Sequence, residues 1–392
     1  MKTILFLGAD AAYLHAFRGS LMAWFRDCGY RVVAVAAVLG DFDPGVFEPM
    51  GVTFRAWPLS KAGLDPLADL GPVLALWRIM RRDKPDILFA HTIKAVIYGV
   101  IVASLAGVRR RTVMIPGLGY AFTEGGGGLK RRVVGRLARI GYRAALDHAQ
   151  MVIFQNEDDR ETLRRAGALS AATLTGLVNG SGVDMSRFTP GPWPSGPPAF
   201  LMIARLLKDK GVYEYVEAAR RVKSAIPDTR FVLAGGTDTN PAAVPQGQID
   251  AWVAEGLIEA RGHVRDPRPD FAACHVFVLP SYYREGCPRV NLEAMAMGRA
   301  IITTDWVGCR ETVTDGLNGL LVPARDPQAL SDAMLAMARD LDRARAMGEE
   351  GRRLCRDRFE LGLVTEQTAR LIAGRAQDLA RRRPRPHSGK TR

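Results

Sequence analysis

Charged side chains directly follow apolar runs in the second half of the chain, and the densest group is the segment Glu285-Gly-Cys-Pro-Arg-Val-Asn-Leu-Glu293. This segment lies between the apolar run Val276–Leu279 and an apolar helical stretch, and Gly286 and Pro288 mark the turn into that helix. The first-turn amides of such a helix are unpaired and partly positive. A diphosphate is therefore the ligand that we expect at this position.

Two carboxylates bracket this segment: Glu285 precedes the helix, and Glu293 lies about two turns further on. We interpret them as groups that contact opposite ends of a sugar nucleotide, one at the hexose and the other at the ribose. The competing interpretation is structural, because acidic side chains are favoured near any helix N-terminus.

A second charged group, Ala204-Arg-Leu-Leu-Lys-Asp-Lys-Gly211, follows the apolar run Phe200–Ile203 and opens another helix. Arg205 and Lys210 would then lie near the end of the same strand, where cations can clamp phosphates and neutralise a departing diphosphate. A solvated run of charge is the alternative. The position at the carboxyl end of a strand favours the phosphate interpretation.

Glycine pairs are further candidates for contact with a ligand. Gly235 and Gly236 follow the run Phe231–Ala234, and Asp238 and Asn240 come next. Glycine lets the backbone approach a ligand closely, although a plain tight turn would use the same residues.

The glycines of the first half match no nucleotide motif completely. Gly8 follows the first apolar run, and Gly117-Leu-Gly119-Tyr120 follows a later one. Phe122 stands where GxGxxG needs its third glycine, which argues against a dinucleotide site. No GxxxxGK[ST] segment is present, so a P-loop is excluded.

Metal and histidine candidates are weaker. Asp41-Phe-Asp43 spells a DxD metal pattern, but it lies in a polar loop far from the charged groups of the second half, so we expect no metal there. His15 and His91 each lie near a strand end or the following loop. Both stay candidates for lining a cleft, although a lone histidine is more often structural.

Short apolar runs alternate with longer helical stretches along the chain, and the runs show no inside–outside alternation. This pattern is typical of parallel sheets covered on both faces. We predict two tandem doubly wound, Rossmann-like α/β domains with a cleft between them, and ligands at the carboxyl ends of strands. The predicted strands are Ile4–Leu7, Val32–Ala36, Ile87–Ala90, Thr112–Ile115, Met151–Phe154, Phe200–Ile203, Phe231–Ala234, Val276–Leu279, Ala300–Thr303 and Gly319–Val322.

The stretch Pro190–Pro198 holds five prolines, which cannot continue a helix or a central strand, so we predict a linker there. The N-terminal domain would span 1–189 and the second domain 199–358. Helical residues 359–380 would fold on the second domain or cross back to the first. The basic tail 381–392 is expected to be disordered.

Charge is unevenly distributed along the 392 residues. Lys and Arg number 54 against 41 Asp and Glu, and residues 1–190 carry +8 of the net +13. A basic first half suits anionic lipid, diphosphates or nucleic acid. Five scattered cysteines without a CxxC pair indicate a reducing cytoplasm. The uncharged run Ala95–Val108 is shorter than the roughly 20 residues of a spanning helix, so no transmembrane segment is expected.

The stretch 129–146 predicts a basic amphipathic helix with six cations and no acid: Lys130, Arg131, Arg132, Arg136, Arg139 and Arg143. Its apolar residues Leu129, Val133, Leu137, Ile140 and Ala144 share one face. Such a helix can lie on an anionic bilayer, and a second basic stretch at Trp77–Arg82 adds to this expectation. A core-facing helix with a wet basic face is the competing interpretation.

The two charged groups together resemble the motifs of one enzyme family. Glu285 and Glu293 match the E-x7-E element of the retaining glycosyltransferases of the nucleotide-sugar family numbered four, and the segment from Arg205 to Lys210 matches that family's R-x4-K element. The resemblance extends from Ile4 to about Gln367.

Within that family, the chain is most similar to enzymes that extend lipid-linked oligosaccharides. The segments that carry this similarity are Met202–Val212, Gly235–Pro241, Pro280-Ser-Tyr, His91–Gly99 and Gly117-Leu-Gly-Tyr-Ala-Phe. Two departures stand out: many relatives carry a histidine where this chain has Ile115-Pro116-Gly117, and paired glycines where it has only Gly8.

The resemblance implies the GT-B fold, a C-terminal helix that returns to the first domain, and metal-independent transfer with retention by front-face attack. It implies that Arg205 and Lys210 bind the diphosphate and stabilise it as leaving group, and that Glu285 contacts the donor sugar. The implied nucleotide-sugar contacts are Gly8, Gly235, Gly236, Asp238, Asn240, the amides of Asn291 and Leu292, and Glu293. The acceptor-side candidates are His15, His91, Lys94, Gly117 and Tyr120.

We therefore expect a cytoplasmic enzyme, peripheral on the inner face of the cytoplasmic membrane and without a cofactor. It would move a hexose or N-acetylhexosamine from a nucleotide sugar, with UDP as the expected nucleotide, to a polyprenyl-diphosphate-linked saccharide in bacterial surface polysaccharide or glycoprotein glycan assembly. A nucleotide-sugar epimerase of the same architecture is the alternative, since it would isomerise the donor without an acceptor. A basic non-catalytic module that binds nucleic acid would show steeply salt-dependent affinity, but no recognition motif supports it.

Overall fold

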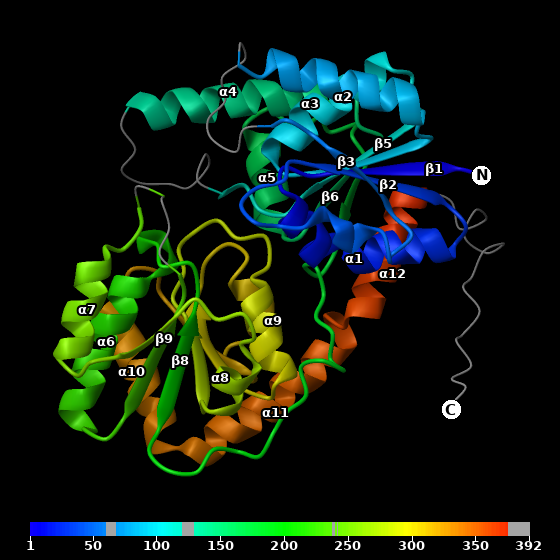
Figure 1. Cartoon of the computed structure of the whole chain (residues 1–392). Helices are drawn as coiled ribbons and strands as arrows, with labels where there is room; N and C mark the ends of the chain where they lie inside the picture. Colours follow the sequence, from blue (N-terminus) through cyan, green and yellow to red (C-terminus); the bar gives the residue numbers. More distant parts are fainter. Residues whose placement is uncertain (60–67, 120–128, 237–239, 241, 375–392) are drawn as a thin grey trace, which may run out of the picture. The chain divides into compact units, whose positions relative to one another are not determined.

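The chain folds into two α/β units in a computed structural model that describes residues 1–59, 68–119, 129–236, 240 and 242–374 (Figure 1). The first unit comprises Met1–Ser181 together with the chain from Gly362, and the second comprises Gly182–Leu361. The predicted fold class, two parallel-sheet α/β domains in tandem, is confirmed.

Seven parallel strands form the sheet of the first unit, in the order β3-β2-β1-β4-β5-β6-β7. The strand order reverses at β1, which lies between β2 and β4, as in other doubly wound sheets. The strands are Thr3–Leu7 (β1), Arg31–Ala36 (β2), Thr53–Ala56 (β3), Ile87–His91 (β4), Arg110–Ile115 (β5), Met151–Phe154 (β6) and Thr175–Leu177 (β7).

Helices cover both faces of this sheet, because successive side chains of its central strands point to opposite sides. Leu5 and Leu7 pack under α2, α3 and α4, whereas Ile4 and Phe6 pack under α1 and α12. The helices of this unit are Ala11–Asp27 (α1), Leu70–Asp83 (α2), Ile93–Leu105 (α3), Leu129–Leu146 (α4), Glu157–Arg165 (α5) and Leu361–Ala373 (α12), with a 3₁₀ turn at Pro44–Phe47.

Six parallel strands form the second sheet, in the order β10-β9-β8-β11-β12-β13. They are Ala199–Ile203 (β8), Arg230–Ala234 (β9), Glu259–Gly262 (β10), Val276–Leu279 (β11), Ala300–Thr304 (β12) and Gly319–Val322 (β13). The helices are Val212–Ala225 (α6), Gln246–Ala254 (α7), Arg268–Ala272 (α8), Arg289–Ala296 (α9), Pro327–Arg339 (α10) and Leu341–Arg358 (α11), with 3₁₀ turns at Lys208–Lys210 and Arg310–Thr312.

The proline-rich stretch 190–198 packs on the second unit. The Trp193 ring meets the His275 ring edge-on at 5.4 Å between centroids, and the Arg299 guanidinium lies 5.2 Å from the centre of the Trp193 ring. The His275 side chain also bonds the carbonyl of Pro194 at 3.1 Å. The passages between the two units fall at Ser181–Gly182 and Leu361–Gly362.

The last described helix, α12, packs on the first unit. Ala369 and Ile372 join the core beneath α1, and Arg110 donates to the carbonyl oxygens of Leu371, at 2.9 Å, and Ile372. These carbonyls end the helix and lack partners inside it, so the arginine stabilises that end. The predicted basic tail lies outside the described residues.

None of the helices in the described part of the chain is both long enough and apolar enough to cross a bilayer.

Candidate active site

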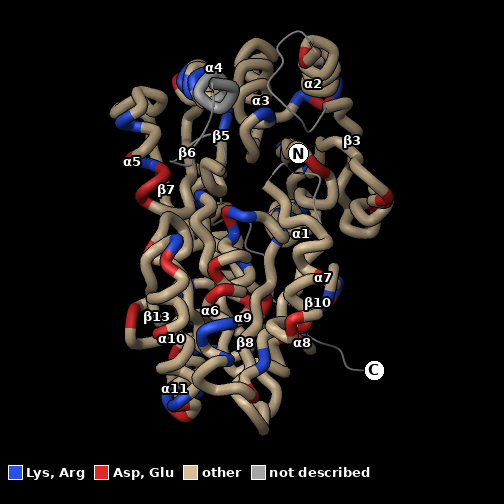
Figure 2. Tube along the Cα trace, turned by 90° about the vertical axis from the view of Figure 1, so that its left-hand side faces the viewer, with Lys and Arg blue, Asp and Glu red and all other residues tan. Residues whose placement is uncertain are grey.

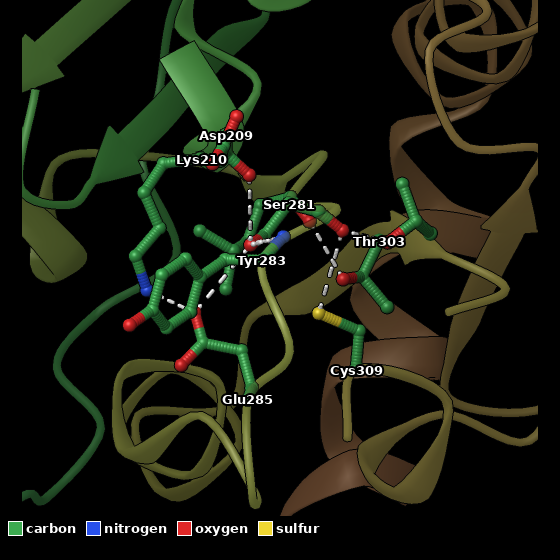
Figure 3. A network of polar contacts seen from close by, with 9 residues as sticks. Asp209, Lys210, Ser281, Tyr283, Glu285, Thr303 and Cys309 are labelled. Carbon is green, nitrogen blue, oxygen red and sulfur yellow. Dashed lines mark hydrogen bonds and ion pairs between the residues drawn. The ribbon is translucent and has the colours of Figure 1, made fainter. Parts of the chain in front are cut away.

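Three loops at the carboxyl edge of the second sheet bring the predicted cations and Glu285 together (Figure 3). They follow β8, β11 and β12, and β11 lies between the other two strands. In parallel sheets this edge is where ligands bind. Segments 75 residues apart in sequence, at Lys210 and Glu285, therefore meet in space.

The loop after β8 positions Lys210. A single 3₁₀ turn at Lys208–Lys210 ends at Gly211, whose φ of +80° lies in the left-handed region. A Cβ atom on Gly211 would overlap the carbonyl oxygen of Pro280, so glycine allows this loop to pass directly over the β11 loop. The backbone N–H of Tyr282 donates to the carbonyl of Asp209 at 2.9 Å and joins the two loops.

The Lys210 ammonium forms an ion pair with Oε1 of Glu285, and both side chains are largely buried. Lys210 Nζ also lies 5.1 Å from the centre of the Tyr283 ring, and the guanidinium of Arg205 lies 5.8 Å from that centre. The negative face of an aromatic ring attracts cations. One ring therefore gathers the two cations of the predicted phosphate site beside one carboxylate.

Ser281 connects the three loops through hydrogen bonds (Figure 3). Its hydroxyl lies 3.4 Å from both the carbonyl oxygen of Asp209 and Oε1 of Glu285, and its carbonyl accepts from the Thr304 hydroxyl. Ser281 itself is fully buried. The Cys309 thiol points to the same carbonyl at 3.8 Å, and burial raises its pKa to about 12, so it stays a neutral thiol at pH 7.

Glu293 lies on α9 and pairs with Arg289 one turn earlier, at 3.1 Å. Burial raises the pKa of the Glu293 carboxyl above its usual value, and the nearby positive charge of Arg289 opposes this shift. No side chain caps α9 at Pro288. The N–H of Asn291, predicted to contact phosphate, donates to the carbonyl of Pro288 at 3.0 Å.

Two further predicted contacts, Gly235 and Gly236, lie at the carboxyl end of β9. A Cβ on Gly235 would overlap the carbonyl of Ala204, and a Cβ on Gly236 would approach the His263 side chain. Asn240 accepts from the backbone N–H of Ala242 at 2.9 Å, which stabilises its own turn. Asp238 lies outside the described residues. Leu292 is fully buried in the core of the second unit.

In the first unit, the acceptor-side candidate His91 is adjacent to Gly8, which was predicted as a nucleotide-sugar contact. Gly8 lies beside the imidazole of His91, with Cε1 2.9 Å from where a Cβ on Gly8 would stand. Burial, and then the positive charge of Arg18, lower the pKa of His91 well below its usual value, so its ring is neutral at pH 7. Its ring also stacks at 5.8 Å on Tyr13, the third residue of α1.

Two other candidates of the first unit, Lys94 and His15, have structural partners. Lys94 is buried and forms an ion pair with Asp69 at 2.9 Å. His15 packs edge-on against Phe47 at 5.6 Å. Gly117 follows β5 with a φ of +126°, whereas Tyr120 lies outside the described residues.

The DxD pattern has a structural role at its second residue. Asp43 caps the 3₁₀ turn at Pro44–Phe47 by accepting from the backbone N–H of Gly45 at 2.8 Å. In the part of the chain that the structure describes, no three His, Cys, Asp or Glu side chains are grouped as metal ligands.

Three residues of this site were not predicted as functional from the sequence: Ser281, Tyr283 and Thr304. Ser281 and Tyr283 belong to the turn after Leu279, whose Pro280-Ser-Tyr segment we used only as part of the family resemblance. Polar and aromatic residues within a strand-end turn were the available signal. Thr304 is the last residue of β12, and nothing in its neighbourhood marked it.

Two protein families match the chain in succession. A glycosyl transferase 4-like domain matches residues 15–180, and a domain of the glycosyl transferases of group 1 matches residues 197–340. Together they span the strands from β2 to β13. The family resemblance predicted from the two motifs is thereby confirmed.

Two bacterial relatives share most of the chain. The N,N'-diacetylbacillosaminyl-diphospho-undecaprenol alpha-1,3-N-acetylgalactosaminyltransferase of Campylobacter jejuni is 27% identical, covering 86% of this chain and 89% of that protein. The UDP-Gal:alpha-D-GlcNAc-diphosphoundecaprenol alpha-1,3-galactosyltransferase of Escherichia coli is 25% identical, covering 70% and 72%.

Solved structures share the fold. Sucrose-phosphate synthase from Thermosynechococcus elongatus superposes with a TM-score of 0.79 at 20% identity, over 97% of this chain and 100% of that one. Anabaena HepE in complex with UDP-glucose gives 0.74 at 19% identity, over 96% and 100%. The chain therefore belongs to the group 1, family-four-like glycosyltransferases with the GT-B fold.

Proposed function

We propose that the chain moves a hexose or N-acetylhexosamine from a UDP sugar to a polyprenyl-diphosphate-linked saccharide, with retention of the anomeric configuration. The observation that carries this proposal is the convergence of Arg205 and Lys210 on the Tyr283 ring, beside Glu285, at the carboxyl ends of β8 and β11. The two cations suit the diphosphate end of a sugar nucleotide, and the carboxylate suits the hydroxyls of its sugar.

The ion pair between Lys210 and Glu285 suggests how the donor binds. A bound diphosphate would compete for the Lys210 ammonium, and the freed Glu285 carboxylate would accept hydrogen bonds from hydroxyls of the donor sugar. As the bond between sugar and phosphate breaks, Arg205 and Lys210 would stabilise the charge that develops on the departing UDP. The proposal includes no metal cofactor, because these cations supply the positive charge.

The acceptor half of the proposal rests on the relatives. The Campylobacter and Escherichia proteins are named for transfer to sugars on diphospho-undecaprenol. Such an acceptor is held in a membrane by its lipid, so the enzyme would act at the inner face of the cytoplasmic membrane. His91, at a strand end of the first unit, is the residue that we propose for the acceptor side, and Gly8, the predicted nucleotide-sugar contact, lies next to its ring.

The test is a transfer assay with the purified full chain. UDP-linked hexoses and N-acetylhexosamines are screened by thermal shift, and those that bind are incubated with a short-chain polyprenyl-diphosphate-linked saccharide. We expect a product heavier by one sugar residue in mass analysis, the α linkage by NMR, and no loss of rate with EDTA. An isomerised donor in the absence of acceptor would instead identify an epimerase.

Two substitutions connect this activity to the site. Glu285→Ala and Lys210→Ala should each lower the transfer rate by roughly 100-fold or more, in the range seen when a group that stabilises the transition state is removed. Their melting temperatures should stay close to that of the unmodified chain. Near-normal turnover in both variants would refute the roles assigned here.

A further inference from the structure

The outer side of α4 exposes its large apolar side chains. Leu137 and Ile140 are 41% and 59% exposed, although both belong to the apolar face predicted for this helix. The side that packs on the protein instead carries Ala138, Tyr142 and Ala145, all fully buried. The core-facing interpretation of the predicted apolar face is therefore wrong.

Arginines flank this exposed stripe. Arg136, Arg139 and Arg143 are all exposed on α4, and Figure 2 shows blue, cationic positions on the described part of this helix. The described part of the helix contains no acidic residue. Lys130, Arg131 and Arg132 lie in the first turns of α4, but their side chains lie outside the described residues.

Helix α2 repeats the arrangement. Leu70, Leu74 and Trp77, spaced by four and three residues, are 62%, 46% and 41% exposed on one side of the helix. Arg81 lies next on the same side, with its guanidinium 5.9 Å from the centre of the Trp77 ring. The one acidic residue inside α2, Asp83, is buried and paired with two arginines of the sheet.

The two helices flank α3 on the same face of the first sheet. We call the outward side of this layer the α2–α4 face, defined by Leu70, Leu74, Trp77, Arg78, Arg81, Leu137, Ile140, Arg136, Arg139 and Arg143. Exposed leucine, isoleucine and tryptophan side chains among arginines are unusual on a surface that meets only water. They are typical of helices that lie in the interface of an anionic bilayer.

We propose that the α2–α4 face docks on an anionic lipid bilayer, with Trp77, Leu137 and Ile140 entering the headgroup region and the arginines binding lipid phosphates. This proposal rests on the proposed function and deepens it, since it identifies the surface by which the enzyme reaches a lipid-linked acceptor. Tryptophan is favoured at this depth of a bilayer, and arginine binds phosphate through two parallel hydrogen bonds.

The positive charge of the α2–α4 face favours an anionic bilayer, rather than a second copy of the chain, as the surface that it docks on. A symmetric dimer through this face would bring the same arginines of two copies together, because the same patch then occurs on both partners. Within the described residues, neither helix exposes an acidic side chain that could compensate those charges. An anionic bilayer supplies the opposite charge over the whole face.

The experiment is vesicle flotation of the full chain in the absence of donor and acceptor. We expect binding to phosphatidylcholine vesicles that contain about 30% phosphatidylglycerol, and much weaker binding to pure phosphatidylcholine. Replacing Arg136, Arg139 and Arg143 by Gln should weaken binding about 100-fold, at roughly five-fold per arginine. The double variant Leu137→Gln/Ile140→Gln keeps every charge and should weaken binding about ten-fold.

A matched control and a depth probe complete the design. Leu174 is 66% exposed in the first unit, outside the α2–α4 face, and Leu174→Gln should bind vesicles like the unmodified chain. Brominated lipids should quench part of the tryptophan fluorescence, and Trp77→Phe should remove that part.

Binding that is unchanged in both α4 variants would overturn the proposal, as would a dimer in sedimentation that the double variant converts to monomer. Because the flotation needs no chemistry, its failure leaves the transfer assay with a soluble short-chain acceptor as a separate test of the proposed function. Melting temperatures near that of the unmodified chain would show that the variants fold.

Discussion

Lys210 and Glu285 are ion-paired although 75 residues separate them, and the pair lies against the Tyr283 ring. The two side chains come from loops after different strands, β8 and β11. Both side chains can bind the donor only after the ion pair between them breaks. The pair is therefore a local competitor of the diphosphate for Lys210.

This competition predicts opposite effects on nucleotide affinity. Glu285→Gln removes the competing charge, so UDP should bind several-fold more tightly while sugar transfer falls. Lys210→Met should weaken UDP binding by roughly ten-fold or more, since a charge-assisted hydrogen bond contributes about 1.5–3 kcal/mol. Isothermal titration with UDP measures both affinities. Equal losses of affinity in the two variants would mean that Glu285 does not compete for Lys210.

The contacts of the Tyr283 ring lead to a second prediction, which compares two variants of this residue. Tyr283→Phe keeps the ring under Arg205 and Lys210, so its UDP affinity should be close to normal. Tyr283→Leu removes two cation–π contacts worth about 0.5–1 kcal/mol each at partly exposed sites, which corresponds to a loss of roughly five- to thirty-fold. Titration with UDP separates the two, and if Tyr283→Phe loses as much as Tyr283→Leu, the hydroxyl rather than the ring is responsible.

The central strands could be predicted because burial on both faces demands continuous apolar sequence. Val276–Leu279 has the same bounds in sequence and structure, and all four residues are buried. The strands that were missed, Thr53–Ala56, Thr175–Leu177 and Glu259–Gly262, are β3, β7 and β10, which lie at sheet edges and are partly or fully exposed. Pairing with a neighbour, rather than their own pattern, makes them strands.

The sequence predicted which strand ends carry the charged residues of the site, but not the contacts that the loops make there. That Arg205, Lys210 and Glu285 meet follows from parallel topology. The bridging role of Ser281 depends on loop geometry that no spacing encodes. On α4, sequence grouped Leu137 and Ile140 correctly but could not orient them, because the helix packs closely on α3 through Gly141, where a Cβ would overlap Ile97.

The close contact of Gly211 with the β11 loop leads to a third prediction, which concerns the placement of Lys210. In Gly211→Ala the new Cβ would meet the Pro280 carbonyl and the left-handed φ would be strained, so both stability and UDP affinity should fall. Gly256→Ala is the control: its φ of +69° carries the same strain, about 1–2 kcal/mol, but nothing lies within 4 Å of the added Cβ. Chemical denaturation and UDP titration compare them, and similar values in both measurements would argue against the loop contact.

His275 predicts how stability depends on pH. Its Nδ1 accepts from the backbone N–H of Ala199 at 3.1 Å, and its Nε2 faces the carbonyl of Pro194, so the ring must be neutral with its proton on Nε2. Burial is the main cause that lowers the pKa of His275 below its usual 6.5. The unfolded chain therefore binds the proton more readily than the folded chain does.

This stabilising contribution is present above about pH 6.5 and is lost as the pH falls toward the lower pKa of the folded state, by at most about 1.4 kcal/mol per pH unit. Denaturant unfolding between pH 7.5 and 5 should show the loss. His275→Gln should reduce this slope, because Gln cannot take up a proton, whereas His148→Gln, at an exposed position, should leave the slope unchanged. If both variants keep the full slope, another group is responsible, and the buried His91, whose pKa is also lowered, is the next to replace.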